Sequence, residues 1–181
     1  MSEVKRLLPL MHDVVDMLTR NGYMGYKFVI PTVETTAEYV KAQVAKWRVK
    51  PELVPATQRY DIYSKSYLAI VASGTVSAEL AMLHIPTIVV YQMNPITTWL
   101  VRQMIRVRWV SLVNILLNRG VYPEFLGPAA SAENVIDAVG QLTIPSKREK
   151  MINELKSADN LWMRPEGSPS KLIAQGIKKT A

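Results

Sequence analysis

The residues best suited to chemistry lie in the stretch LAIVASGTVSAELAMLHIPTIVVY, at positions 68–91. An apolar run stops at Ser73, Gly74 and Thr75, a helical pattern follows, and a second apolar run closes the stretch. Glycine has no side chain to keep a ligand away from the backbone. The N–H groups and the dipole of a helix amino terminus favour a phosphate. The spacing therefore indicates a phosphate-binding turn.

Glu79 is the only charged residue of this stretch, four positions after Thr75. Residues four apart share one side of a helix, so the Glu79 carboxylate should lie on the side of the turn. There it could accept hydrogen bonds from ribose hydroxyls, as the acidic residue of dinucleotide-binding folds does. Phosphate at the turn and ribose at Glu79 together indicate a nucleoside diphosphate. The pattern leaves a second interpretation open, in which Ser73 or Thr75 only caps the helix and Glu79 balances its dipole.

Positive charge gathers after Glu79. The chain carries a net charge of +7 and has no acidic residue between Glu79 and Glu124. Residues 94–110 interleave aromatic and cationic side chains: Trp99, Arg102, Arg106, Arg108 and Trp109. Such a segment could lie against an anionic membrane surface or form an ordinary packed helix with its arginines in water. Because no nucleic-acid-binding motif accompanies it, we expect no nucleic acid partner.

Several classes of protein find no support in the sequence. The chain lacks cysteine, and His12 and His84 are isolated from any second ligand at metal spacing, so no metal is expected. Neither a Ser-His-Asp arrangement nor a Walker loop is present. No window reaches the roughly 18 uncharged apolar residues of a membrane span. Acidic residues interrupt the first twenty positions, which argues against a signal peptide. We therefore expect a soluble, cytoplasmic chain.

The elements that would position these residues alternate along the chain. Of its 181 residues, 49% are hydrophobic, which suits one ordinary domain. Apolar runs predict short strands, and amphipathic spacing predicts helices between them. Predicted strands cover residues 26–30, 53–54, 68–72 and 87–91. Predicted helices cover residues 3–20, 35–47, 61–67, 76–83, 96–105, 132–142 and 146–162.

This alternation indicates an α/β fold, a Rossmann-like parallel sheet with helices on both faces and further helices at the C-terminal end. We expect one nucleotide-binding domain over residues 1–163 and a loosely ordered tail over 164–181. In such sheets ligands bind beyond the carboxyl ends of the strands, where the Ser73–Thr75 turn would lie.

Two longer motifs carry a resemblance to a known family. They are ASGTVSAELAMLHIPTIVVYQMNPIT at residues 72–97 and WVSLVNILLNRGVYPEFL at residues 109–126. The sequence over about residues 2–142 resembles lipid-A-disaccharide synthase, a GT-B glycosyltransferase. The matching positions are Ala72, Ser73, Gly74, Thr75, Glu79, Pro86, Tyr91, Met93, Pro95, Thr97, Val110, Ser111, Leu112, Asn114, Arg119, Pro123 and Glu124. The resemblance implies the C-terminal, donor-binding domain of a two-domain enzyme.

The resemblance also implies substrates and roles. The family transfers 2,3-diacylglucosamine from its UDP derivative to 2,3-diacylglucosamine 1-phosphate, releasing UDP, and related GT-B enzymes hold UDP without a bound metal or other cofactor. Carried over here, the Ser73–Thr75 turn would face the diphosphate and Glu79 the uridine ribose. Asn114 and Arg119 would face the donor side of the cleft. The lipid substrates imply peripheral contact with the cytoplasmic face of the inner membrane, and pairing with a second copy is left open.

The sequence departs from the family pattern in and around these motifs. Gln92 replaces a basic residue of the family pattern, and Val113 replaces a proline. Gly120 replaces a glutamate, and Gly127 replaces a glutamine. The family's N-terminal domain, which holds the acceptor site and the expected base, has no counterpart here. The same is true of a Gly-Ser-Arg loop that the family has just before the segment resembling Ser2-Glu3-Val4. We expect the chain alone to bind donor weakly and to hold no catalytic residue. The alternative is an inactive Rossmann-like remnant or a binding or pairing module without catalysis.

Overall fold

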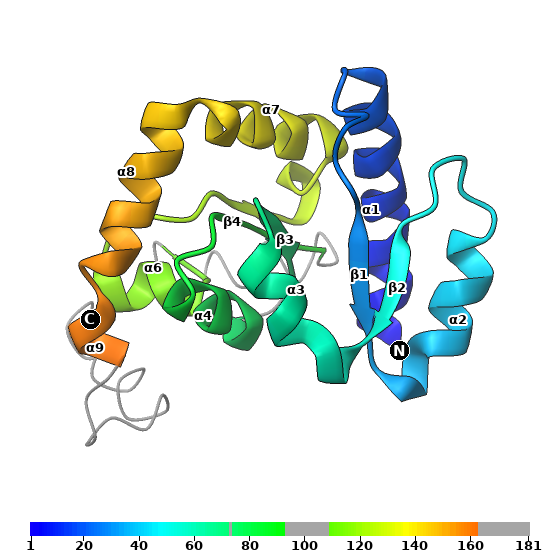
Figure 1. The fold of residues 1–181 in the computed structure, drawn as a ribbon, viewed down its shortest axis with the longest axis horizontal. Coiled ribbons are helices and arrows are strands. Elements are labelled where there is room, and N and C mark those ends of the chain that lie inside the picture. Colours follow the sequence, from blue (N-terminus) through cyan, green and yellow to red (C-terminus); the bar gives the residue numbers. More distant parts are fainter. Residues whose placement is uncertain (73, 93–108, 163–181) are drawn as a thin grey trace.

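Strands and helices alternate through most of the chain (Figure 1). The structure, a computed structural model, describes residues 1–72, 74–92 and 109–162. The helices are α1 (Ser2–Arg20), α2 (Glu34–Val44), α3 (Arg59–Lys65), α4 (Gly74–Met82), α6 (Leu112–Leu117), α7 (Ala132–Thr143), α8 (Pro145–Lys156) and α9 (Asp159–Trp162). The strands are β1 (Val29–Thr32), β2 (Glu52–Pro55), β3 (Ala69–Val71), β4 (Thr87–Tyr91) and β5 (Glu124–Leu126). Two short 3-10 turns, η1 (Ala56–Gln58) and η2 (Gly127–Ala129), follow β2 and β5.

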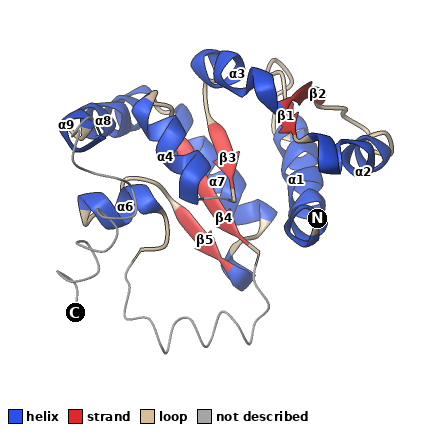
Figure 2. Ribbon diagram, turned by 90° about the horizontal axis from the view of Figure 1, so that it is seen from below, coloured by secondary structure: helices blue, strands red, loops and turns tan. Residues whose placement is uncertain are grey.

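All the described strand pairs are parallel, and they form two sheets. β1 pairs with β2, and β4 lies between β3 and β5 (Figure 2). Figure 1 shows α7 on one side of the three-stranded sheet and α4 and α6 on the other. The expected α/β fold with helices on both faces is therefore confirmed, with two small parallel sheets instead of one. Because parallel strands share a direction, the loops that leave them gather at one edge of each sheet.

Several predicted boundaries differ from the structure. The strand predicted to stop before Pro31 instead runs through it, with Pro31 opposite Val54. Among the described strands β1 has a neighbour on one side only, and proline is tolerated in such an edge strand because the outer N–H groups need no partner. The helix predicted over 146–162 is divided into α8 and α9. The helix α6 and the strand β5 were not predicted, and the predicted helix 96–105 and tail 164–181 lie outside the described residues.

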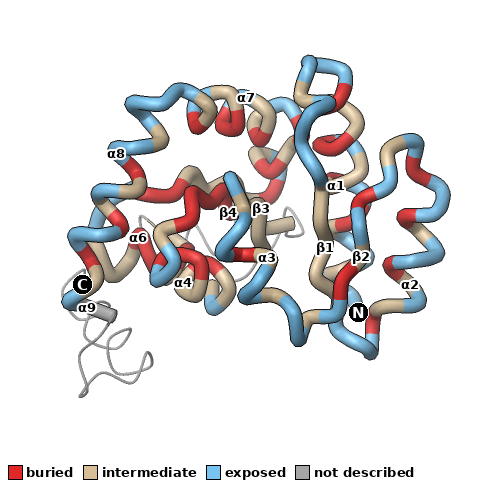
Figure 3. Tube along the Cα trace, in the orientation of Figure 1, coloured by how far each residue is buried: buried red, intermediate tan, exposed pale blue. Residues whose placement is uncertain are grey.

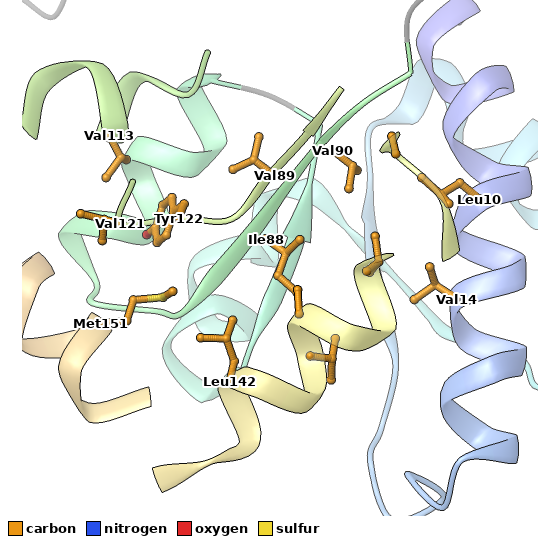
Figure 4. Packing of buried hydrophobic residues seen from close by; sticks show 14 of the residues in the cluster. Leu10, Val14, Ile88, Val89, Val90, Val113, Val121, Tyr122, Leu142 and Met151 are labelled. Atoms are coloured by element: carbon orange, nitrogen blue, oxygen red, sulfur yellow. The ribbon is translucent and has the colours of Figure 1, made fainter. Parts of the chain in front are cut away.

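The main hydrophobic core is built around β4. Ile88, Val89 and Val90 are fully buried there and belong to one cluster with residues of α1, α7 and α8 (Figure 4). Figure 3 shows how burial follows the inner faces of these elements, while their outer faces are exposed. A four-residue run of buried side chains in β4 is what a parallel strand covered on both faces requires.

A second core cluster lies against β1 and β2. It consists of Leu8, Val15, Val40, Val44 and Trp47. The helix α1 serves both clusters, because its neighbouring residues Leu10 and Val14 belong to the main core. Within the described ranges, no helix has the length and apolar character needed to cross a bilayer.

Candidate nucleotide-binding site

The turn from β3 into α4 lies at the carboxyl edge of the three-stranded sheet, as the sequence predicts. β3 ends at Val71 and α4 begins at Gly74, while Ser73 lies outside the described residues. A Cβ added to Gly74 would meet only the Tyr91 hydroxyl, at 3.8 Å, which is ordinary van der Waals contact. The described packing therefore does not require glycine at this position. The absent side chain leaves space toward the edge where a ligand would bind.

The amino terminus of α4 provides the electrostatics expected for an anion. The first turn of this helix contains no acidic residue, so the helix itself places no carboxylate at the positive end of its dipole. Thr75 is exposed in this turn, and Ser77 is buried with its hydroxyl donating to the Gly74 carbonyl at 2.7 Å. The Ser77 hydroxyl thus turns inward, while Thr75 lies on the exposed face of the first turn, the side from which a phosphate would approach.

Glu79 lies one turn further along α4 and pairs with a residue that the sequence did not indicate. Its Oε2 is 3.3 Å from Nε of Arg59, the first residue of α3. Both side chains are only partly exposed, 26% for Glu79 and 36% for Arg59. The hydrogen bonds that Arg59 donates to Tyr60 and Glu79 raise its pKa, so the guanidinium stays charged. The only sequence signal for Arg59 is its place just after β2, at the carboxyl edge of the other sheet.

Tyr91, the last residue of β4, completes this edge. Burial raises the pKa of its hydroxyl, and the charges of Glu124 and Glu3 raise it further, so Tyr91 stays protonated. Its hydroxyl makes no hydrogen bond within the described part of the chain and lies beside Gly74. Tyr91 belongs to the motif but was not among the predicted site residues. A neutral hydroxyl next to a helix amino terminus can donate to an anion bound there.

Asn114 has a different environment from the one expected. It is fully buried, and its Nδ2 donates to the Tyr122 carbonyl at 2.8 Å and to Glu124 Oε1 at 2.7 Å. Its Oδ1 accepts the N–H groups of Val121 and Tyr122, both at 2.9 Å. The Glu124 carboxylate also accepts the N–H groups of residues 110 and 111. Asn114 therefore holds the loop between α6 and β5, and its polar atoms have no capacity left for a ligand.

Arg119 lies away from the Gly74 turn. It follows α6 in the loop that leads into β5, and such a loop lies at the amino edge of a parallel strand, opposite the edge that holds the turn. Its Nη2 is 3.2 Å from the Ser157 hydroxyl, and it lines an open groove with residues of α8. The structure thus brings together Gly74, Glu79, Arg59 and Tyr91, but separates Arg119 from them.

The positions that depart from the family pattern have local structural roles. Gln92 donates to the Ala130 carbonyl at 2.9 Å, and Val113 is fully buried in the main core. Gly127 adopts a positive φ of 56°, a conformation that favours glycine. Gly120 lies directly under the indole of Trp109, since a Cβ there would come within 2.5 Å of the ring.

Of the five side chains proposed to face a membrane, the structure describes that of Trp109. Trp99, Arg102, Arg106 and Arg108 lie outside the described residues. The Trp109 indole packs over Gly120, and its Nε1 is buried. This ring therefore packs within the domain, not outward toward a bilayer.

Comparison with known proteins identifies the family. The family model described as "Lipid-A-disaccharide synthetase" matches residues 1–166. Curated proteins named lipid-A-disaccharide synthase are 34% identical over 178 residues in Rhodospirillum centenum and 31% identical over 178 residues in Gluconobacter oxydans. These alignments cover 97% of this chain but 44% and 43% of the two relatives, so the chain spans less than half of their length. The chain belongs to the lipid-A-disaccharide synthetase family, a family of glycosyltransferases.

Proposed function

We propose that this chain is the C-terminal, donor-binding part of a lipid-A-disaccharide synthase and binds UDP-2,3-diacylglucosamine at the carboxyl edge of its sheets. The observation that carries the proposal is the arrangement of Gly74 and Glu79 on one helix at this edge. Family membership supports a nucleotide-sugar donor and a lipid acceptor in general terms. The geometry supports the particular placement of the nucleotide.

In this proposal the UDP lies along the first turn and a half of α4. The diphosphate binds at the helix amino terminus near Gly74, where the N–H groups, the helix dipole and the Tyr91 hydroxyl can donate to it. The ribose hydroxyls donate to the carboxylate of Glu79. The rise from Thr75 to Glu79 along the helix axis is about 6 Å, so the two ends of the site are about one helical turn apart.

The chemical role of these residues is to bind the leaving group. During transfer, an acceptor hydroxyl oxygen bonds to the anomeric carbon of the donor while the bond from that carbon to the UDP oxygen breaks. The hydroxyl proton passes to a base. Negative charge grows on the departing phosphate, and the amino terminus of α4 stabilises it.

The acceptor and the base belong elsewhere in this proposal. Inverting transfer needs a base within hydrogen-bond reach of the acceptor hydroxyl. Glu79 is committed to Arg59 and the ribose, and Tyr91 is held protonated by burial. We infer that the base and the acceptor site come from the part of the relatives that this chain does not span. Because both substrates are lipids, peripheral contact with the inner membrane is part of the proposal.

Calorimetric titration with UDP tests the placement. The wild-type chain should bind UDP saturably, and Glu79→Ala should weaken binding by about tenfold or more, since a hydrogen bond to a charged group is lost. Glu38→Ala, which removes an exposed carboxylate of α2, is the matched control and should leave the affinity unchanged. Equal UDP affinity in the wild type and Glu79→Ala would contradict the proposal, as would the absence of saturable binding.

A further inference from the structure

We propose that Arg59 is a positioning residue that fixes the Glu79 carboxylate and thereby gives the site its preference for ribose over deoxyribose. The proposal rests on the proposed function, because it assumes that Glu79 receives the ribose. It adds a residue and a specificity that the family motifs do not contain. The argument depends on how both members of this ion pair are held.

Arg59 is fixed by its own turn of the chain. Its Nη1 donates to the Ala56 carbonyl at 3.3 Å, and its Nη2 donates to the Tyr60 hydroxyl at 3.1 Å. The guanidinium carbon also lies 4.4 Å from the centre of the Tyr60 ring, a cation–π contact. These contacts restrain a side chain that would otherwise have several rotatable bonds. With the guanidinium held in this orientation, its Nε–H donates to Glu79.

Within the part of the chain that the structure describes, Glu79 is held through one of its two carboxylate oxygens. Oε2 accepts from Arg59, whereas Oε1 has no hydrogen-bond partner among the described residues. A carboxylate fixed at one oxygen presents the other in a defined direction. That geometry suits an acceptor for a ribose hydroxyl. Because orienting the group in advance lowers the entropy lost on binding, Arg59 should raise the affinity for a ligand that uses this oxygen.

A purely structural role is the competing explanation for the pair. Arg59 begins α3 and Glu79 lies on α4, so the contact also ties two helices together. Ion pairs that are this exposed contribute little to stability. The side chains also leave one carboxylate oxygen open, which a contact made only for stability would not require. These points favour the positioning role.

The test compares UDP with 2′-deoxy-UDP as ligands of the full chain. The wild type should bind UDP more tightly than 2′-deoxy-UDP. Arg59→Met should weaken UDP binding by about two- to tenfold, the cost of ordering one side chain on binding, and should leave 2′-deoxy-UDP binding nearly unchanged. The ratio of the two dissociation constants should therefore fall toward one. A merely structural role would not change this ratio.

The chain offers a closely matched control in Arg148. Its guanidinium carbon lies 4.0 Å from the centre of the Tyr67 ring, and its Nη1 donates to the Tyr67 carbonyl at 2.7 Å. Within the described ranges it forms an ion pair with no carboxylate. Arg148→Met should leave the affinities for both ligands unchanged. Arg148→Met removes an arginine that is stacked on a tyrosine, whereas Arg59→Met removes such an arginine together with its contact to Glu79. Comparing the two variants therefore isolates the effect of the Glu79 contact.

Further variants separate the failure of this inference from the failure of the proposed function. Glu79→Gln should also abolish the ribose preference. If Glu79→Gln abolishes it and Arg59→Met does not, Arg59 has no positioning role and the proposed function stands. If Glu79→Gln does not change UDP binding, the ribose site is elsewhere and both proposals fail.

Two more outcomes would overturn the positioning role alone. One is equal weakening of both ligands by Arg59→Met together with a lower melting temperature, which would indicate a structural contact. The other is full recovery of the ribose preference in Arg59→Lys. Lysine keeps the charge but cannot reproduce the fixed Nε–H contact, so recovery would mean that charge alone is sufficient.

Discussion

At the scale of single residues, Asn114 shows how a motif residue can act through the loop it holds. Its amide satisfies two acceptors and two backbone donors at once, all in the buried region between α6 and β5. The carboxylate of Glu124, which accepts from Asn114, also accepts from the N–H groups of residues 110 and 111 and so links this region to the segment before α6. In the motif of residues 109–126, Asn114 therefore stabilises the backbone of the loop and does not present its amide to a ligand.

We predict that Asn114→Ala lowers the free energy of unfolding by about 2–4 kcal/mol, because two buried N–H groups and a carbonyl lose their partner. Thermal or urea unfolding measures this change. Asn134→Ala is the control: Asn134 is only partly buried, and its side chain makes one hydrogen bond, to the Ala129 carbonyl at 2.9 Å. The control should cost about 1 kcal/mol. Similar losses in the two variants would show that the Asn114 network does not stabilise the fold as argued.

The sequence identified the residues of α4 better than it identified their partners. Gly74 and Glu79 were predicted because the turn and the spacing along one helix are local features. Arg59 was missed because it meets Glu79 only after α3 and α4 pack together, twenty residues apart in sequence. Arg119 was assigned to the donor side from the resemblance alone, and the structure places it in the loop between α6 and β5. Neither of these elements was predicted, so the sequence provided no expectation of which edge of the sheet this loop occupies.

At the scale of elements, the alternation of strands and helices was predictable, and the breaks in it were not. The bounds of β4 were predicted correctly from its apolar run. That run is continuous because all residues of the strand except the last are buried. β5 was missed because it is only three residues long and partly buried throughout. The division between α8 and α9 falls at residues 157–158, where the chain turns within a pattern that is otherwise helical.

The loop between α6 and β5 permits a prediction about Gly120. A Cβ at this position would lie 2.5 Å and 2.9 Å from two carbons of the Trp109 ring. Gly120→Ala must therefore displace the indole, and we expect a loss of about 1–3 kcal/mol. The change in melting temperature and the shift of the Trp109 indole N–H resonance measure it.

Gly140 provides the control for that loss. It lies within α7, and a Cβ there would find its nearest atom, the Tyr23 hydroxyl, at 3.9 Å. Gly140→Ala should be neutral or should stabilise the protein by up to about 1 kcal/mol, because alanine is favoured over glycine inside a helix. An unchanged Trp109 resonance and stability in Gly120→Ala would refute the close packing.

At the scale of the whole molecule, α1 joins the two sheets. Its residues Leu8 and Val15 pack in the cluster beside β1 and β2, while Leu10, Val14 and Leu18 pack in the main core. The helix α3, which carries Arg59, follows β2 of the small sheet but packs beside the three-stranded sheet, because its Tyr63 lies in one buried cluster with Leu80 of α4 and with Ile85. The Arg59–Glu79 ion pair is therefore held by the packing of α3 against α4.

Leu8 and Leu10 allow a matched test of that connection. Both are 7% exposed, but they lie on different faces of α1 and in different clusters. Leu8→Ala and Leu10→Ala should each cost about 2–5 kcal/mol, the usual range for truncating a buried leucine. If α1 makes the two sheets one cooperative unit, each variant should reduce hydrogen-exchange protection in β1–β2 and in β4 by the same factor.

Independent sheets would give a different result. Leu8→Ala would then reduce protection only in β1 and β2, and Leu10→Ala only in the three-stranded sheet. That outcome would mean that α1 does not couple the two parts. Under cooperative unfolding, by contrast, both leucine variants should weaken UDP binding only in proportion to the fraction of unfolded chain.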